Sequence, residues 1–105
     1  MPRFLYVYHA DQPMRPDPEQ AAEAMAAWGR WMEGLGPKLV DPGEPVGISK
    51  SVTKDGVLDR VENAAFGYSI VEADTMEEAC EMAKGNPMVT GGGSVEVAEV
   101  MKIDM

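Results

Sequence analysis

The chain contains a single histidine, and its spacing to a carboxylate is the first indication of possible chemistry. His9 stands two residues before Asp11, at the end of a short apolar segment. If this segment is a strand that continues through Asp11, both side chains share a face, and the carboxylate can orient the imidazole as a general acid or base. The alternative is a strand-end histidine that binds a backbone carbonyl, with Asp11 in solvent. His9 and Asp11 are therefore the candidate catalytic residues.

A second group of side chains is suited to binding an apolar molecule. The aromatic set consists of Tyr6, Tyr8, Trp28, Trp31 and Tyr68, and the chain also has 9 methionines. In a small domain some of these side chains fill the core, Trp28 first among them, and the others line a pocket or a dimer interface. We expect Tyr8, Trp31 and Tyr68 to contact a ligand, with the core as an equal alternative for Trp31 and Tyr68.

Few other groups in the chain could react. Cys80 is the only cysteine, which excludes an internal disulfide, and no basic neighbour in the sequence activates it, so we interpret it as a small core residue. The carboxylates are scattered without the spacing of a calcium loop, and we expect neither a metal nor a cofactor. Gly91, Gly92 and Gly93 precede a predicted strand, whereas phosphate-binding glycine loops lead into helices, so a turn is favoured.

Composition narrows the class of protein. The 105 residues have a mass of 11.4 kDa, and we expect a single domain over 1–105. Hydrophobic residues make up 45% of the chain, and 18 Asp and Glu against 9 Lys and Arg give a net charge of −9. An acidic surface excludes nucleic acid and anionic membranes as partners. No apolar run reaches the roughly 18 residues of a membrane span, and the N-terminus lacks a secretory pattern, so we expect a cytoplasmic protein.

Hydrophobic periodicity predicts the elements that position these residues. The segment 5–8 has the composition of a strand, with apolar side chains on both faces. A helix follows from Pro18, with Asp17 as its cap, and Gly36 with Pro37 stops it. Its apolar stripe consists of Ala21, Met25, Trp28, Met32 and Leu35.

The middle of the chain is predicted to be turns and β-structure. The stretch 38–45 is rich in turn residues. A hairpin follows, with strands at 48–53 and 57–61 joined through Lys54, Asp55 and Gly56.

A strand, a helix and a last strand complete the pattern. The strand at 66–71 precedes a helix that opens with a capping box of Thr75 and Glu78. Gly85 ends this helix, Pro87 prevents its continuation, and 94–103 forms the last strand. The expected inner face of the helix is Met76, Ala79, Cys80 and Ala83. The order of elements predicts an α+β fold of the ferredoxin-like, split βαβ kind with an extra hairpin.

The second half of the chain resembles the YCII-related family, which includes YciI-like proteins, and in particular its DGPF branch. Short segments in a fixed order carry the resemblance, namely 66–74, 77–79, 86–87 and 91–97. It implies a chain that pairs with a second copy as a dimeric α/β barrel in which the two sheets face each other. Such pairing would explain a first strand that is apolar on both faces.

The chain departs from this family at two points. The DGPF motif is absent, because 59–66 stands in its place. The catalytic pair proposed for the YciI-like branch is a first-helix His and an Asp before a proline, but here that helix has no His and Asn86 replaces the Asp. An amide cannot exchange a proton as a carboxylate does, so the pair does not carry over. We include Asn86 among the expected ligand-binding residues instead.

Two functions are compatible with the sequence. The first is a small dimeric protein that binds an apolar or aromatic metabolite in a cleft. The alternative is a cofactor-independent isomerase or lyase-like enzyme, with His9 as general acid or base and Asp11 as its orienting partner, by analogy with other dimeric barrels. The position of His9 separates them, because the enzyme needs this side chain in a concave pocket, within hydrogen-bond reach of a carboxylate and facing Trp31 or Tyr68. If His9 is sealed in the dimer barrel or bonded only to backbone, the enzyme loses its acid–base candidate.

Overall fold

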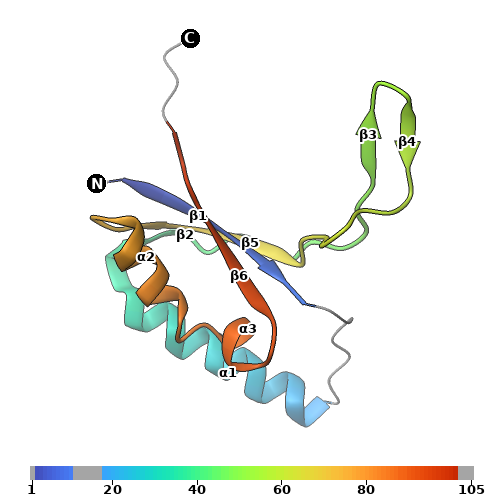
Figure 1. The fold of residues 1–105 in the computed structure, drawn as a ribbon. Coiled ribbons are helices and arrows are strands. Elements are labelled where there is room, and N and C mark those ends of the chain that lie inside the picture. The colour runs from blue at the N-terminus through green and yellow to red at the C-terminus, as the bar shows by residue number, and fades with distance from the viewer. Residues whose placement is uncertain (1, 11–17, 102–105) are drawn as a thin grey trace.

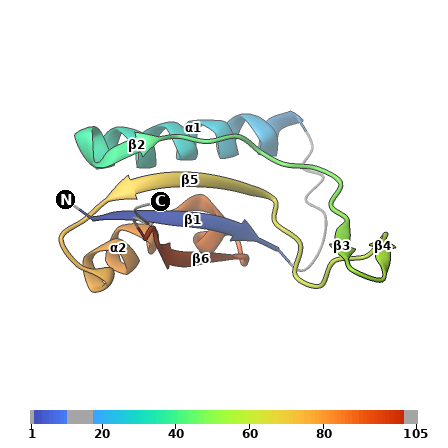
Figure 2. The same cartoon turned by 90° about the horizontal axis from the view of Figure 1, so that it is seen from above.

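A four-stranded antiparallel sheet forms the centre of the molecule. The computed structural model describes residues 2–10 and 18–101. The strand order is β2-β5-β1-β6 (Figure 2), and each neighbouring pair is antiparallel. The strands are β1 (Arg3–His9), β2 (Leu39–Asp41), β5 (Gly67–Glu72) and β6 (Ser94–Glu99). This arrangement confirms the predicted α+β, ferredoxin-like fold.

The helices lie together on one side of this sheet (Figure 1). They are α1 (Pro18–Leu35), α2 (Met76–Ala83) and the short α3 (Pro87–Thr90). The helix α1 ends at the 3-10 turn η1 (Gly36–Lys38), as the glycine and proline predicted. Thr75 caps α2, because its hydroxyl accepts a hydrogen bond from the Glu78 N–H at 3.1 Å. Asp17, the expected cap of α1, lies outside the described residues.

Side chains alternate along the strands between the face of the sheet that the helices cover and the face that they leave free. On β1, Phe4, Tyr6 and Tyr8 point towards the helices and are at most 4% exposed. Leu5 and Val7 point the other way and remain partly exposed. They pair with Ile70 and Tyr68 of β5, so the face that the helices leave free is also apolar. We call the face formed by Leu5, Val7, Tyr68 and Ile70 the open face.

Polar atoms on aromatic side chains join the buried face to the helices. The Tyr6 hydroxyl donates a hydrogen bond to the Ala79 carbonyl of α2. The Trp31 indole N–H of α1 donates to the Met82 carbonyl at 3.0 Å. The rings of Tyr6 and Trp31 also lie together, with centroids 6.1 Å apart. Burial raises the pKa of the Tyr6 hydroxyl far above its ordinary value, so it remains a donor.

The side of α1 that packs on the sheet agrees with the predicted stripe at Trp28, Met32 and Leu35. The prediction is wrong at Met25, which is 76% exposed, and Trp31, predicted to lie beside the stripe, is buried at 9% exposure. The two large indoles fill the space above the tyrosines of β1, so the packed side is turned towards Trp31 and away from Met25.

The side of α2 that packs on the core also differs from the prediction. Cys80 is exposed and Met76 is 37% exposed, although both were expected on the inner face. The buried positions are Ala79 and Ala83. These small residues let the helix backbone approach β1 closely enough for the Tyr6 hydroxyl to reach it.

Two further elements correct the sequence analysis. Pro87 does not end helical structure but begins α3, because the Asn86 side chain accepts the Met88 N–H at 2.8 Å and caps the new turn. The stretch 38–45 contains β2, whose Leu39 pairs with Val71 of β5. A strand of three residues is too short to show alternation, so only the pairing reveals it.

The predicted hairpin forms as a separate two-stranded sheet. Its strands are β3 (Ser51–Thr53) and β4 (Gly56–Leu58), both shorter than expected. It extends beyond the end of the main sheet and rises on the side away from the helices (Figures 1 and 2). Its apolar side chains are strongly exposed, with Val52 at 76% and Val57 at 60%. The last strand ends at Glu99, and Ile103 of the prediction lies outside the described residues.

None of the helices in ranges 2–10 and 18–101 has the length and apolar character needed to cross a membrane.

Replacing Tyr6 with phenylalanine tests the link between β1 and α2. Tyr6→Phe removes the donor and leaves the Ala79 carbonyl without that bond, so we expect the free energy of unfolding to fall by about 1–2 kcal/mol. Urea denaturation measures the change, and Val52→Ala in the exposed hairpin is the control, with an effect within about 0.5 kcal/mol. An unchanged midpoint for Tyr6→Phe would show that this bond does not hold the layers together.

Candidate ligand-binding site

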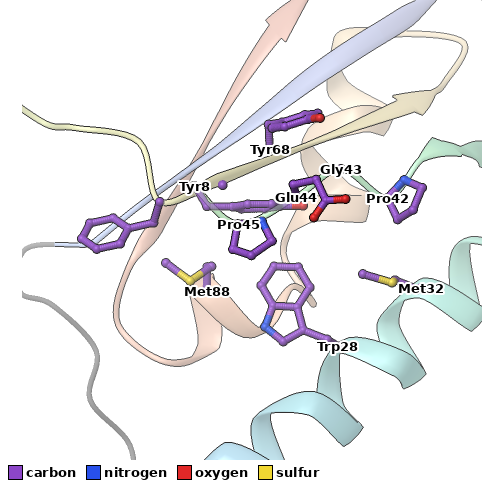
Figure 3. A pocket seen from close by; sticks show the side chains of 11 residues that line it. Tyr8, Trp28, Met32, Pro42, Gly43, Glu44, Pro45, Tyr68 and Met88 are labelled. Atoms are coloured by element: carbon purple, nitrogen blue, oxygen red, sulfur yellow. The ribbon is translucent and has the colours of Figure 1, made fainter. Parts of the chain in front are cut away.

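A cavity of about 360 Å³ lies between α1 and one end of the sheet (Figure 3). We call it the aromatic cavity. The helices contribute Trp28, Met32 and Met88 to its lining, and the segment after β2 contributes 42–45. The strands contribute Tyr8, Gly67 and Tyr68, and Phe66 lies at the edge of β5.

Aromatic rings stacked edge to face form the inner wall of the aromatic cavity. The Trp28 ring meets the Tyr8 ring at an interplanar angle of 81°, with centroids 5.0 Å apart. On its other side Trp28 meets Trp31 at 89° and 5.8 Å. Edge-to-face contacts of this kind hold ring planes in place. Trp31 therefore lies behind the wall and supports Trp28, which is the ring that faces the cavity.

A chain of hydrogen bonds fixes the Tyr8 hydroxyl. It donates to the Ser69 hydroxyl at 2.6 Å, and Ser69 donates to the Pro42 carbonyl at 2.8 Å. Burial raises the pKa of Tyr8, an effect opposed in part by Ser69 and by the nearby Asn86 amide. The phenol is thus neutral at ordinary pH and connects β1, β5 and the segment 42–45, rather than acting as a base.

Close backbone contact holds the segment 42–45 against β5. Gly43 has a φ of +74°, and a Cβ atom at this position would lie 1.7 Å from the Tyr68 carbonyl oxygen. Only glycine satisfies both conditions. The Asp41 carboxylate accepts the Gly43 N–H at 2.8 Å and shapes the turn. Figure 3 shows this segment between Tyr68 and Trp28, so it forms one wall of the aromatic cavity.

The two stems of the hairpin border the aromatic cavity. Pro45 forms an isolated bridge with Gly67, and the Phe66 N–H donates to the Tyr8 carbonyl at 2.7 Å. The Val46 N–H donates to the Phe66 carbonyl at 3.0 Å. The chain therefore leaves for the hairpin, and returns from it, at the mouth of the cavity.

Asn86 lies deep in the structure near this wall, although it is not part of the lining. Its side chain is fully buried, and its Oδ1 caps α3. Its Nδ2 has no hydrogen-bond partner among the described residues. A buried amide donor without a partner is uncommon in folded proteins, and an ordered water would satisfy it.

His9 lies on the same side of β1 as Leu5 and Val7, outside the aromatic cavity. Its Nε2 is 3.0 Å from a Glu96 carboxylate oxygen on β6, and its Nδ1 is 3.3 Å from the Ala64 carbonyl. It borders a separate polar cavity of about 160 Å³ that Asn63 and Gly92 also line. We call this the histidine cavity.

Among the described residues, Glu96 is the carboxylate beside His9. Asp11 itself lies outside the described residues. Val7 pairs with Glu96, and His9 pairs with Ser94, so His9 and Glu96 are diagonal neighbours on one face. The sequence indicated part of this contact, because alternation in the last strand places Ser94 and Glu96 on the same face of the sheet. The register of β6 against β1 was needed to show that this is also the face of His9.

The structure brings together part of the predicted ligand-binding set. Tyr8 and Tyr68 line the aromatic cavity, whereas Trp31 and Asn86 are buried near it. Trp28, expected in the core, is half-buried and faces the cavity. Met32 and Met88 belong to the methionines that the sequence indicated as a set without positions, and the segment 42–45 was not anticipated. Flanking prolines around Gly43 were a possible signal, because they indicate a rigid loop.

Charged groups are sparse at the aromatic cavity. Of the described lining residues, Glu44 alone carries a charge. Within residues 2–10 and 18–101, no three His, Cys, Asp or Glu side chains gather closely enough to hold a metal ion. The chemistry that the cavity supports is therefore stacking and apolar contact.

Comparison with solved structures places this geometry in a known fold. The chain is similar to 5-chloro-2-hydroxyhydroquinone dehydrochlorinase from Burkholderia phenoliruptrix, whose structure is a complex with 2,5-dihydroxybenzoquinone. The TM-score is 0.57 and the sequence identity 20%, over 96% of this chain and 94% of the other. This similarity shows a shared small α+β fold. No family model matches the sequence, and no curated protein matches it.

Alanine at Gly43 tests the wall formed by 42–45. Gly43→Ala forces an unfavourable φ and a collision with the Tyr68 carbonyl, so we expect a loss of more than about 2 kcal/mol in the free energy of unfolding. Gly47→Ala is the matched control, because a Cβ atom there meets nothing within 4 Å, and its effect should stay within about 0.5 kcal/mol. Equal urea midpoints for the two variants would contradict the assignment.

Proposed function

We propose that this protein binds a small aromatic metabolite in the aromatic cavity and acts as a homodimer of the YCII-related kind. The observation that carries the proposal is the cavity itself, about 360 Å³ in volume, with the Trp28 and Tyr8 rings on one side. Ligand pockets in proteins span roughly 300–1,000 Å³, so this one suits a ligand with one or two rings.

The character of the lining supports an aromatic rather than a charged ligand. Methionines at 32 and 88 provide polarizable sulfur atoms beside the rings, and such thioethers contact aromatic faces favourably. The Tyr8 hydroxyl already donates its hydrogen bond to Ser69, so a ligand needs no acceptor group at this point. The quinone in the dehydrochlorinase complex is, like the proposed ligand, a flat six-membered ring compound, which supports the proposal by analogy.

The enzymatic alternative has less support from the geometry. A cofactor-independent isomerase or lyase that uses His9 and Asp11 requires a proton-transfer group at the substrate. His9 borders the histidine cavity, with the Glu96 carboxylate 3.0 Å from its Nε2, but it is not part of the aromatic lining. The proposal is therefore a binding function, and catalysis by His9 and Asp11 stays a prediction.

Trp28 provides a direct test of ligand binding. We expect wild-type protein to bind 2-naphthol, a neutral two-ring phenol, and Trp28→Leu to bind it at least tenfold more weakly, because the stacking face is lost. Isothermal titration calorimetry measures both affinities. Met25→Leu, an exposed site on the same helix, should stay within about twofold of wild type. If no phenol or quinone of this size binds the wild type, the proposed function is wrong.

The open face supports the homodimer. Leu5, Val7 and Ile70 form its apolar centre. Arg3 and Glu72 form a salt bridge at 3.6 Å on its edge. An apolar centre with a polar rim is the usual anatomy of a protein interface. A second copy that places its own open face here would bury both apolar centres.

The proposed location is the cytoplasm. The chain is acidic and has one cysteine, which suits a reducing compartment.

A charge in the open face tests this pairing. Ile70→Glu places a carboxylate at the centre of the proposed interface, so we expect a dimer of the wild type and a folded monomer of the variant at micromolar concentration. Sedimentation equilibrium gives the mass and circular dichroism confirms the fold. Met25→Glu on the outer side of α1 should remain dimeric. A monomeric wild type would exclude the barrel.

A further inference from the structure

His9 connects three separate parts of the chain although it is almost completely buried. The residue is 6% exposed and lies at the end of β1. One ring nitrogen faces Glu96 of β6, and the other faces the carbonyl of Ala64, in the segment that returns from the hairpin. The ring is thus the link between the sheet and that returning segment.

Both ring nitrogens of His9 face hydrogen-bond acceptors. A carboxylate and a backbone carbonyl accept but cannot donate at ordinary pH. The neutral imidazole carries one N–H and can satisfy only one of them, whereas the imidazolium carries two and can satisfy both. The number of links that His9 makes therefore depends on its protonation.

The segment that His9 holds leads directly into the wall of the aromatic cavity. Ala64 is two residues before Phe66, whose side chain lines the cavity and whose N–H is bound to the Tyr8 carbonyl. Asn63, the residue before Ala64, has a φ of +50°, in the left-handed region that asparagine adopts more readily than most residues. The contact from His9 to Ala64 therefore holds the end of a tight turn.

We propose that His9 is a positioning residue that couples ligand binding in the aromatic cavity to pH. In its charged form it holds Ala64 and Glu96 together and keeps Phe66 against the cavity. As the ring loses its proton, one link is lost, the segment 63–66 loosens, and ligand affinity falls. This inference rests on the proposed function, because it describes regulation of the same cavity.

The charged groups around His9 are few. From β6, Glu96 faces the ring, with its own side chain 59% exposed. The histidine cavity is completed by Ala10, Asn63, Gly92, Gly93 and Ser94, none of which titrates. Among the described residues, Glu96 is thus the titratable neighbour, and only the doubly protonated ring donates to both Glu96 and Ala64. The direction of the effect is tighter binding at low pH.

The chain has one histidine, so its imidazole signals in an NMR spectrum belong to His9. Affinity for 2-naphthol is measured by calorimetry between about pH 5.5 and pH 8, where imidazoles titrate, and NMR follows the one imidazole and the backbone amides of Ala64 and Phe66. We expect wild-type affinity to fall about fivefold with rising pH, and the two amide signals to shift with the same midpoint as the ring. His9→Gln should bind with an affinity independent of pH.

The controls separate this inference from the proposed function. Glu99→Gln removes a charge from the same strand away from His9 and should retain the pH dependence, and sedimentation across the range checks for a change of oligomeric state. Binding that does not vary with pH would overturn the inference and leave the proposed function intact. Absence of binding at every pH would overturn the proposed function. In that case, amide signals of Ala64 and Phe66 that shift with the same midpoint as the His9 ring would support the coupling between His9 and the segment 63–66. Amide signals that do not shift with pH would refute this coupling.

Discussion

Burial of two tyrosine hydroxyls on the central strand is the constraint on which the rest of this structure depends. A phenol can enter a core only if its oxygen finds a partner. The Tyr6 hydroxyl finds the Ala79 carbonyl of α2, and the Tyr8 hydroxyl finds Ser69 on the neighbouring strand. These two bonds set the height of α2 above the sheet and the position of the segment 42–45, which Ser69 binds in turn. Core and candidate site are therefore built on alternate residues of one strand.

The aromatic cavity arises where this packing changes along β1. At Tyr6 the space beneath the helices is filled, because Trp31 covers the ring and binds the α2 backbone. At Tyr8 the facing residue is Trp28, whose ring meets the tyrosine ring edge to face and also lines the cavity. The same helical spacing that buries one indole leaves the other only half-covered. A pocket with aromatic walls thus follows from the core rather than being added to it.

Local signals in the sequence predicted much of the fold, and pairing between distant segments decided what they missed. The cap at Thr75, the stop at Gly36 and the hairpin turn depend on neighbouring residues, and each was confirmed. The strand β2 and the choice between Trp28 and Trp31 depend on which partner lies across the core, which no local pattern contains. For the same reason Glu96, nearly ninety positions from His9, could be assigned only after the register of β1 and β6 was known.

The two walls of the aromatic cavity differ in stiffness, and this bears on ligand choice. Pro42 and Pro45 have fixed φ angles and flank a glycine that is locked against Tyr68, so this side keeps its shape. Met32 and Met88 are unbranched and can change rotamer at little cost. A ring that slides between them would have its plane set by the prolines and its width accommodated by the thioethers. Such a cavity requires a flat ligand but tolerates differences in ligand width. The same protein can therefore bind a series of related ring compounds.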